Sequence, residues 1–430
     1  MSQPEKNTQP RKLGFRNVVR LGYVSLFTDV STEMILGVLP LFIVRVLGGT
    51  AAILGLIEGV AEASNYIFRV FAGILTDRIG KRKPLVLLGY GLSTFAKPLF
   101  AVANSWGQAF GVRVIDRAGK GTRTSPRDAL ISDSVAKAEA GKGFGLHRSL
   151  DQLGAVLGPL FAFVAIPFIG VRGVFWVSFV PAVMALIILV FFVRDSRGQG
   201  EHRSPFQNMR TVLNHEFVLL LVFLGIFAAG AYDFSFILLK AGTLGISEND
   251  IPLVYAVLNV ATVILGLPAG IFADKAGKLP VLCVGFVLFL VTSTAGLFLA
   301  GNALYGFLIA FLFGSYLAIS DTVQRALIPD FTKPKLKGTG YALYYTLIGF
   351  CSFLANSIFG FLWTNFSSAV AFEYSVATST VGIIALVTFL ALRKYKTGPK
   401  HRLIKRPPEL PVLQNSLQLT EVRRPTRSCF

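Results

Sequence analysis

The stretch RVIDRAGKGTRTSPRD, residues 113–128, places five basic and two acidic side chains within sixteen positions of an otherwise apolar chain. A phosphate-binding loop would need glycine at position 114 and serine or threonine after Lys120, where the chain has Val114 and Gly121. Two interpretations of the stretch remain: a basic loop in water, or a charged helix inside a membrane. The elements around the stretch decide between them.

The composition is that of a membrane protein. The 430 residues are 53% hydrophobic and 15% charged, with 38 Phe and a mean hydropathy of +0.61. Apolar runs such as 174–193 and 216–239 each reach the roughly 20 residues that a helix needs to cross a bilayer. A net charge of +19 in such a chain reflects basic loops, so no nucleic-acid partner is expected. The first apolar segment is too long for a signal peptide, and we expect it to be retained.

The hydropathy pattern predicts an all-α membrane protein with twelve transmembrane helices. The predicted spans cover residues 20–44, 51–75, 84–103, 106–130, 150–168, 173–193, 217–240, 251–273, 279–300, 303–328, 340–362 and 370–392. Lys and Arg gather in every second connection, as at 78–83 and 275–278, and the other connections are nearly bare. The positive-inside rule then predicts a multi-pass protein of the cytoplasmic membrane with both termini in the cytoplasm.

The spans fall into two groups around one long polar connection. We expect a cytoplasmic N-terminal segment (1–19), a first six-helix bundle (20–193), a cytoplasmic linker (194–216), a second six-helix bundle (217–392) and a disordered basic tail (393–430). The basic residues of the tail suit anionic lipid headgroups.

An internal repeat relates the two bundles. GILTDRIGK (73–81) aligns with GIFADKAGK (270–278) at an offset of 197 residues, and the same offset places ALISD (129–133) on ALIPD (326–330). It also places 106–130 on 303–327, which is plainly a span, so the charged stretch is a transmembrane helix. Duplicated halves of this kind are typical of transporters whose substrate site lies between the halves.

The chain resembles the major facilitator superfamily of secondary transporters. The resemblance covers about residues 18–392 and rests on GILTDRIGKRK after the second span, on its echo after the eighth, and on GAVLGP (154–159) in the fifth. GAVLGP is similar to a motif of the proton-antiporting exporters in that superfamily, with Gly154, Gly158 and Pro159 in the motif positions; its echo is lost in the second half. The family also has an arginine at the place of Arg113 and glycine four residues later, where this chain has Arg117.

The resemblance implies a gate on the cytoplasmic side. In the family the aspartate at the place of Asp77 latches the outward-facing state; we expect Arg123 or Arg127 as its partner, with Asp274 and Arg325 as the counterpart in the second half. The alternative is that Asp77 has no gating role and only caps a turn. The gating residues are thus Gly73, Asp77, Arg78, Gly80, Lys81, Arg123, Arg127, Gly270, Asp274, Gly277 and Arg325.

The charges of the fourth span share one helix face. At 100° per residue, its seven charged side chains between Arg113 and Asp128 fall within an arc of about 140°. Seven charges facing lipid would cost on the order of 20 kcal/mol, so this face must look into protein or water. Residues 123–128 lie near the cytoplasmic end, while Arg113, Asp116, Arg117 and Lys120 are deep.

Other first-half spans carry matching groups, and three roles remain open for the cluster. A buried carboxylate can carry a coupling proton, the excess of basic groups can attract an anionic substrate, or all the charges can form fixed bridges between helices. The proton-coupling candidates are Asp29, Glu33, Glu58, Glu62 and Asp116, and the substrate or pathway candidates are Arg113, Arg117, Lys120, Asn65, Arg69 and Asp233.

The predicted function is secondary active transport of a small organic solute by alternating access, with proton-coupled antiport as the leading mechanism. Proton-linked uptake of an organic anion is one alternative, and a non-transporting membrane sensor or assembly factor is another. Enzyme motifs such as HExxH are absent from the sequence, and the three scattered cysteines suggest neither a disulfide framework nor a metal site. We therefore expect no enzyme activity and no cofactor beyond the proton gradient.

Overall fold

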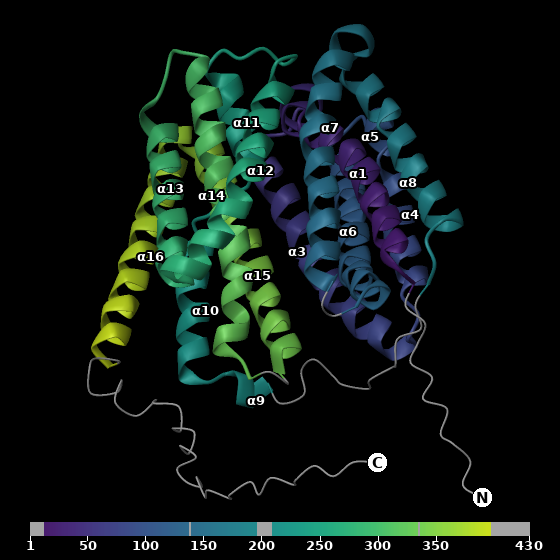
Figure 1. The fold of residues 1–430 in the computed structure, drawn as a ribbon. Coiled ribbons are helices and arrows are strands. Elements are labelled where there is room, and N and C mark those ends of the chain that lie inside the picture. Colours follow the sequence, from purple (N-terminus) through teal and green to yellow (C-terminus); the bar gives the residue numbers. More distant parts are fainter. Residues whose placement is uncertain (1–12, 137–138, 196–208, 334–335, 397–430) are drawn as a thin grey trace, which may run out of the picture. The chain divides into compact units, whose positions relative to one another are not determined.

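The computed structural model of the protein describes residues 13–136, 139–195, 209–333 and 336–396, and the elements in these ranges are helices (Figure 1). Residues 1–12, most of the predicted linker and 397–430 of the predicted tail lie outside the described residues. The boundaries assigned to these polar segments stay predictions.

The first bundle is built from the helices that precede the linker. These are α1 (Phe15–Leu36), α2 (Leu39–Leu41), the π-helix η1 (Phe42–Val46), α3 (Ala51–Ile79), α4 (Lys83–Ala96), α5 (Leu99–Val102), α6 (Trp106–Ser134), α7 (Ala140–Val177) and α8 (Phe179–Phe191). Short elements continue the longer ones where a helix is interrupted: Pro98 follows the end of α4, and Gly37 follows the end of α1.

The second bundle is built from the helices that follow the linker. These are α9 (Met209–Val212), α10 (His215–Ala228), α11 (Phe234–Thr243), α12 (Ile251–Ala276), α13 (Lys278–Phe298), α14 (Leu304–Phe331), α15 (Lys337–Asn365) and α16 (Ser368–Lys396).

Within the described residues, nine segments are long and apolar enough to cross a membrane. One of them, Ala140–Phe191, has 52 residues and holds two spans, because the helix is interrupted at Gly170, whose φ of 66° favours glycine. The short helices α10 and α11 follow each other as the halves of one broken span, and α6 misses the hydropathy limit through its charges. The architecture is therefore consistent with the twelve predicted spans, and the predicted fold class is confirmed.

The same contacts recur in the two bundles at the offset of the repeat. A Cβ built on Gly73 would lie 3.5 Å from the Ser125 side chain, and one on Gly270 would lie 3.6 Å from that of Thr322. Gly143 faces Val135 as Gly340 faces Thr332. Each contact in the first bundle has its counterpart 197 positions later in the second bundle, so the sequence repeat is also a structural repeat.

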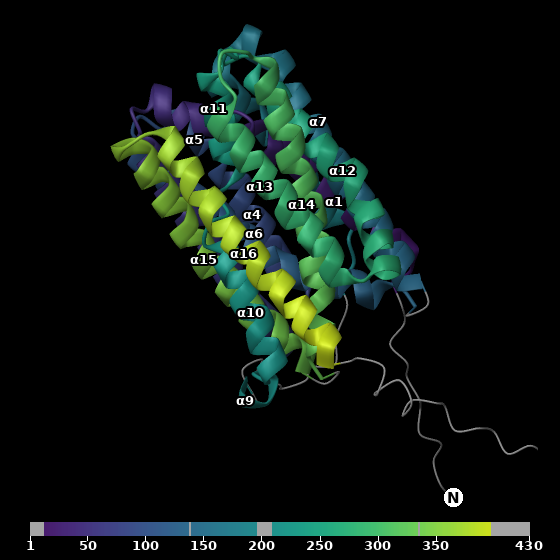
Figure 2. The same cartoon turned by 90° about the vertical axis from the view of Figure 1, so that its left-hand side faces the viewer.

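The two bundles meet along two pairs of helices, α3 with α15 and α7 with α12. Helices α7 and α12 lie side by side in both ribbon views (Figures 1 and 2). In the other pair, glycine lets the backbones approach: a Cβ on Gly55 would collide with the backbone oxygen of Asn356, and one on Gly360 with that of Ala51.

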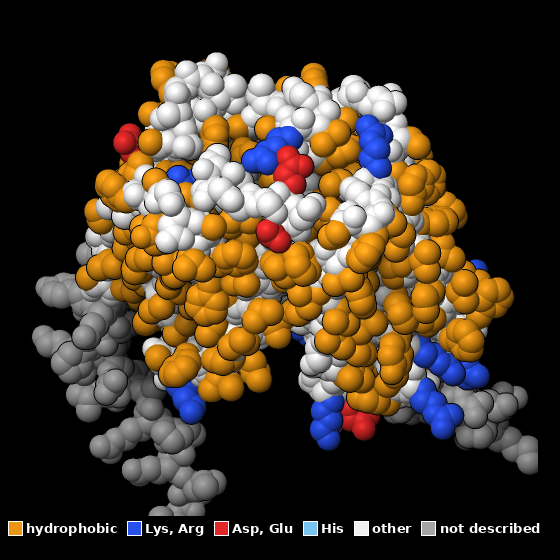
Figure 3. All heavy atoms as spheres, turned by 90° about the horizontal axis from the view of Figure 1, so that it is seen from above, with side chains coloured by type: hydrophobic (Ala, Val, Ile, Leu, Met, Phe, Trp, Pro, Cys, Tyr) orange, Lys and Arg blue, Asp and Glu red, His pale blue; other side chains and the backbone are white. Residues whose placement is uncertain are grey.

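Large apolar side chains cover much of the exterior, as the space-filling view of one face shows (Figure 3). Phe168, Phe191 and Leu267 are 83%, 77% and 74% exposed. On a soluble protein such side chains would form large apolar patches in contact with water. On this helical fold they form a surface that suits contact with the lipid of a bilayer.

Candidate functional site

A cavity of about 410 Å³ lies between the two bundles and is lined by residues of both. A second cavity, of about 320 Å³, shares Arg69, Arg148 and Arg325 with the first and reaches Phe144 and His147 near the beginning of α7. The beginning of α7 lies at the end of the helices where the connections 78–83 and 275–278 also lie, which we call the basic side. The cavity therefore extends toward the basic side.

The bundles are joined at the other end, which we call the opposite side. Arg45, in η1, forms an ion pair with Glu248, before α12, at 2.9 Å. The backbone N–H of Ala52 donates to the hydroxyl of Thr364 at 2.8 Å. These links close the opposite side, so the structure is the state of the protein that is open toward the basic side.

The charged face of α6 is turned inward, as the helical arc predicts. Arg113, Asp116, Arg117 and Arg123 are buried, and the other three charged residues of the arc are half-buried. The resemblance associates close helix contact with a glycine at position 117, where this chain has arginine. In this structure two neighbouring glycines make such contacts instead. A Cβ on Gly119 would collide with the backbone oxygen of Gly89, and one on Gly121 with that of Asn65.

The deep end of the α6 face forms a network inside the first bundle and does not line the cavity. Arg113 binds Glu58 with Nη2 to Oε2 at 2.6 Å and Nε to Oε1 at 3.1 Å, and both side chains are at most 3% exposed. The Arg113 Nη1 lies 3.6 Å from Asp116 Oδ2, and Asp116 also accepts a hydrogen bond from Ser93. Of the coupling and pathway candidates, Arg113, Glu58 and Asp116 thus lie in an interior ion bridge.

A buried lysine near this network was missed by the sequence reasoning. Lys97 is 1% exposed, and its Nζ donates to the carbonyl of Thr28 at 3.4 Å and to the hydroxyl of Ser31 at 3.1 Å. A lysine in the apolar span 84–103, next to Pro98, was the available signal, because such a group needs polar partners inside the protein.

Three of the proton-coupling candidates line the cavity, namely Asp29, Glu33 and Glu62. Glu33 accepts a hydrogen bond of 2.5 Å from the hydroxyl of Tyr255, which belongs to the second bundle. Asp29 lies within hydrogen-bonding reach of Asp151, which also accepts from Ser25 at 2.6 Å. Tyr255 was not among the candidates, and no pattern in the sequence pairs it with Glu33.

The glycines of GAVLGP pack directly against these carboxylates. A Cβ built on Gly158 would lie 2.8 Å from the Cβ of Glu33, and one on Gly154 would lie 3.1 Å from that of Asp29. The motif in α7 therefore sets how closely α7 can approach the part of α1 that carries Asp29 and Glu33. At the place equivalent to Pro159, Asn356 accepts a hydrogen bond from the backbone N–H of Asp233 at 2.7 Å, where span 7 is broken.

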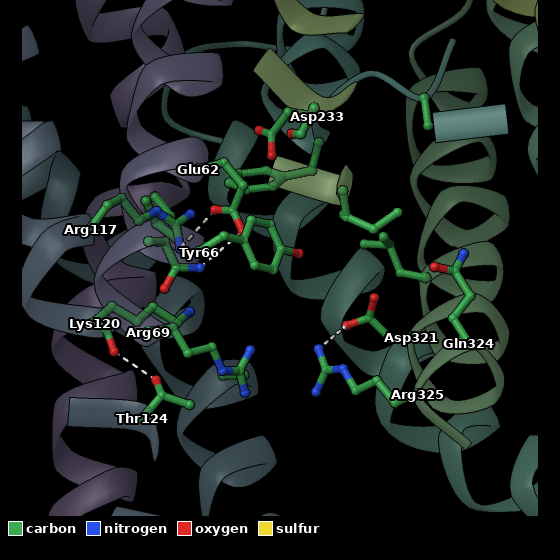
Figure 4. Close-up of a pocket in the computed structure, with 18 of the residues that line it drawn as sticks. Glu62, Tyr66, Arg69, Arg117, Lys120, Thr124, Asp233, Asp321, Gln324 and Arg325 are labelled. Carbon is green, nitrogen blue, oxygen red and sulfur yellow. Dashed lines mark hydrogen bonds and ion pairs between the residues drawn. The ribbon is translucent and has the colours of Figure 1, made fainter. Parts of the chain in front are cut away.

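The remaining pathway candidates line the cavity too: Asn65, and Arg117, Lys120, Arg69 and Asp233, which are labelled in Figure 4. Glu62 accepts from Asn65 at 3.0 Å and lies 3.7 Å from Arg117. Asp233 caps the N-terminus of α11, where its carboxylate accepts a hydrogen bond from the backbone N–H of Ser235 at 3.0 Å.

Aromatic side chains of both bundles form another part of the cavity wall. Those that line it are Tyr66, Phe227, Tyr232, Phe234, Tyr255, Phe313, Tyr316 and Tyr344. Tyr66 stacks on Tyr345 of α15 with ring centroids 5.6 Å apart, and Tyr344 donates to Gln324 at 2.8 Å.

At the basic side, three of the gating arginines have partners among the described residues. Arg127 pairs with Asp128 at 2.9 Å, and the guanidinium of Arg123 lies 4.5 Å from the centre of the Tyr90 ring. Arg325 pairs with Asp321 at 3.1 Å, while Asp274 is exposed.

The gating motif itself forms the tight turn after α3. Gly80 ends this helix with a φ of 67°, and the neighbouring Arg78 and Lys81 are exposed; Gly277 has a φ of 95° at the equivalent turn after α12. The side chain of Asp77 lies outside what the structure describes, so its role as a latch stays a prediction.

For the described part of the chain, no group of three or more His, Cys, Asp or Glu side chains is placed to hold a metal ion. The polar groups of the cavity are charge pairs and hydrogen-bonding groups, and their arrangement suits the binding of a solute and the relay of protons.

Comparison with known proteins places this architecture among transporters. A family model described as Major Facilitator Superfamily matches residues 21–240 and 218–426. An uncharacterized MFS-type transporter of Methanocaldococcus jannaschii is 31% identical over 392 residues, which cover 89% of this chain and 97% of that protein. The quinolone resistance protein NorA of Staphylococcus aureus is 26% identical over 226 residues, or 51% of this chain and 57% of NorA. The solved structure of the nucleoside transporter NupG has the same fold, with a TM-score of 0.73 at 9% identity, over 87% of this chain and 99% of NupG.

Proposed function

The chain belongs to the major facilitator superfamily, whose members are secondary transporters rather than enzymes, and we propose that it exports a small organic solute in exchange for protons. The basic side is then the cytoplasmic face of the cytoplasmic membrane, since Lys and Arg gather there. Likeness to a protein named for quinolone resistance supports export over uptake.

The observation that carries the proposal is the hydrogen bond between Glu33 and Tyr255. It links a carboxylate of the first bundle to the second bundle, within the cavity and beside Gly158 of the antiporter-like motif. A hydrogen bond to an ionised carboxylate is roughly twice as strong as one between neutral groups. Ionised Glu33 therefore holds the bundles in the state that is open to the basic side, and protonation of Glu33 weakens that link.

Alternating access follows from this difference between the two protonation states. A proton that reaches Glu33 from the opposite side favours the state open to that side, because the link to Tyr255 is then weaker. Release of the proton to the basic side restores the link and the state seen here. Asp29 and Asp151 lie in the same cavity and give the proton a second acceptor on its way.

The coupling is tested with proteoliposomes that contain the pH dye pyranine and are loaded with norfloxacin, a quinolone. After dilution into solute-free buffer at the same pH, antiport moves protons inward as the solute leaves, so the lumen becomes acidic. Glu33→Gln is expected to remove the proton movement and to leave exchange of labelled for unlabelled norfloxacin measurable. Tyr255→Phe keeps the carboxylate and is expected to slow the cycle without uncoupling it.

The sign of the pH change separates this proposal from its rival. Proton-linked uptake of an organic anion is favoured by the cations Arg69 and Lys120 in the cavity wall, and such a symporter would make the lumen alkaline as solute leaves. Solute movement without any pH change, in wild type and Glu33→Gln alike, would refute proton coupling. Protein-free vesicles give the background.

A further inference from the structure

The carboxylates and the cations of the cavity wall are not balanced against each other. Five of the six acidic side chains that line the cavity have a hydrogen-bonding or charged partner among the described residues, namely Glu33, Glu62, Asp151, Asp233 and Asp321, and the sixth, Asp29, lies beside the carboxylate of Asp151. By contrast, the described residues offer the Lys120 ammonium neither a hydrogen bond nor an ion pair within 4.0 Å, although it lines the cavity. Arg69 contacts a ring, with its guanidinium 4.5 Å from the centre of Tyr345.

Two buried arginines lie next to this part of the cavity wall. Arg117 lies 3.7 Å from Glu62 and the guanidinium of Arg123 lies 4.5 Å from the centre of the Tyr90 ring, while Arg117 Nε and Arg123 Nη1 have no hydrogen-bond partner among the described residues. Both residues line the cavity. Because the protein encloses both nitrogen atoms, they do not contact a solute directly, and the two guanidinium groups add positive charge behind the cavity wall.

The close-up view shows where such an acceptor fits. Arg69 and Lys120 extend from neighbouring helices of the first bundle into the open space, and Asp321 with Arg325 lies across it (Figure 4). The Asp321 carboxylate is held by Arg325 at 3.1 Å and does not reach the first-bundle cations. The space beside Arg69 and Lys120 is thus bordered by two positive groups that have no ion-pair partner within 4.0 Å among the described residues, although Asp29, Glu33 and Glu62 line the same cavity.

A flat apolar surface adjoins this positive corner. The Tyr66 ring, one helical turn from Arg69, is backed by the stacked ring of Tyr345 and projects into the open space (Figure 4). Phe313 and Leu317 of α14 line the facing wall. Stacking on a tyrosine that is already held by a second ring costs little side-chain entropy and favours a planar partner.

We propose that the transported solute is an organic anion with an aromatic ring, whose anionic group binds between Lys120 and Arg69 and whose ring packs on Tyr66. This rests on the proposed transport function, and it holds for either direction of movement. A carboxylate, a sulfonate and a phosphonate share the necessary chemistry, which is a compact negative group with several acceptor oxygens. Arg117 and Arg123 extend the positive field behind the anion.

The test is equilibrium binding to the purified full chain in detergent, by titration calorimetry at one pH. The probe is naphthalene-2-sulfonate, whose charge does not change with pH, and its matched controls are the neutral 2-naphthalenemethanol and the cationic 2-naphthylmethylammonium. Cyclohexanesulfonate keeps the charge and removes the aromatic ring. The sulfonate probe is expected to bind, the neutral and cationic probes are not, and the cyclohexane compound is expected to bind more weakly.

Variants assign the two subsites. Lys120→Gln and Arg69→Gln are each expected to weaken binding of the naphthalene sulfonate about ten- to a hundredfold, the range for a charge-assisted hydrogen bond. Lys120→Arg keeps the positive charge, and this variant is expected to bind the naphthalene sulfonate. Lys142→Gln removes an exposed positive charge of α7 outside the cavity and serves as the matched control. Tyr66→Leu is expected to abolish the preference for the naphthalene over the cyclohexane compound.

Three results would overturn the inference: no saturable binding of the sulfonate, equal binding of the neutral or cationic probe, or unchanged affinity in both Lys120→Gln and Arg69→Gln. Binding is measured without a proton gradient, so a failure of proton coupling leaves this experiment unaffected. Conversely, proton-coupled movement of norfloxacin in a protein that prefers the cationic probe would sink the ligand class and leave the transport mechanism standing.

Discussion

A variant that breaks the buried bridge between Arg113 and Glu58 tests whether the deep charges of α6 have a structural role or take part in transport. Glu58→Gln keeps the shape of the side chain and removes its charge. Arg113 then retains Asp116, whose Oδ2 lies at 3.6 Å, as its nearest negative partner. If the bridge only holds helices together, its loss should appear in stability rather than in coupling.

The expected magnitude follows from burial. The Arg113 side chain is 1% exposed and that of Glu58 3%, so solvent cannot replace the lost carboxylate. Removal of one partner from a buried pair costs about 3–5 kcal/mol in the free energy of unfolding. Because Asp116 still offsets part of the Arg113 charge, the lower end of that range, about 3 kcal/mol, is expected for Glu58→Gln.

A paired replacement provides the control. In the double variant Glu58→Met with Arg113→Met, one negative and one positive charge are removed together, and apolar side chains of similar length fill their space. Replacement of a buried ion pair by packed apolar groups is often neutral or stabilising. Part of the loss caused by Glu58→Gln should therefore be recovered, because Asp116 loses Arg113 as a partner and keeps its hydrogen bond from Ser93.

The assay is equilibrium unfolding in mixed dodecyl maltoside and SDS micelles, followed by tryptophan fluorescence, together with the pyranine transport assay. The reasoning predicts a large loss of stability in Glu58→Gln, partial recovery in the double variant, and coupled transport in whatever fraction stays folded. A Glu58→Gln protein that is as stable as wild type but no longer moves protons would refute it and would make Glu58 a proton site.

Two further predictions concern helix contacts. Gly158→Ala is expected to cost about 1–3 kcal/mol in the free energy of unfolding, because the new Cβ would lie 2.7 Å from the backbone oxygen of residue 30; Gly111→Ala, where nothing lies within 4 Å, is the control and should not destabilise. Equal stabilities of the two variants would contradict the packing argument. Arg45→Gln removes a half-exposed ion pair worth about 0–1 kcal/mol, so it should favour opening of the opposite side by at most about fivefold. The opening is measured as the rate at which a maleimide reagent added on the opposite side labels Ser352→Cys in the cavity, in a background without native cysteines. A slower labelling rate in Arg45→Gln than in the protein with Arg45 would contradict the prediction.

The sequence was sufficient for the fold because its strongest signals are periodic and repeated. Apolar length predicts the spans, and the repeat at 197 residues predicts that α6 is one of them despite its charge. The repeat also predicts the second-bundle contact between Gly270 and Thr322 from that between Gly73 and Ser125. These features depend on local pattern, which a single sequence contains.

The sequence was not sufficient to separate cavity groups from interior groups. Glu58 and Glu62 lie one turn apart on α3 and share a helix face, yet Glu58 faces Arg113 inside the bundle and Glu62 lines the cavity. The difference comes from which helix packs at each depth, and helical periodicity does not contain that information. The same limit applies to Tyr255, whose contact with Glu33 depends on how the two bundles meet.

The repeat gives the two walls of the cavity a common origin, and at the depth of Arg117 and Lys120 their chemistry differs. At its offset, Arg117 of α6 corresponds to Gly314 of α14 and Lys120 corresponds to Leu317, while Asp116 corresponds to Phe313. Arg117, Lys120, Phe313 and Leu317 all line the same cavity. At this depth a solute between the bundles therefore meets charge from one copy of the repeat and apolar surface from the other, while Asp321 and Arg325 of α14 lie nearer the basic side. An alternating-access cycle moves these walls relative to each other, so a solute with one charged end and one apolar end keeps a contact with each bundle. A purely polar or purely apolar solute would lose one of the two, which is why the divergence of the repeat itself favours an amphipathic anion.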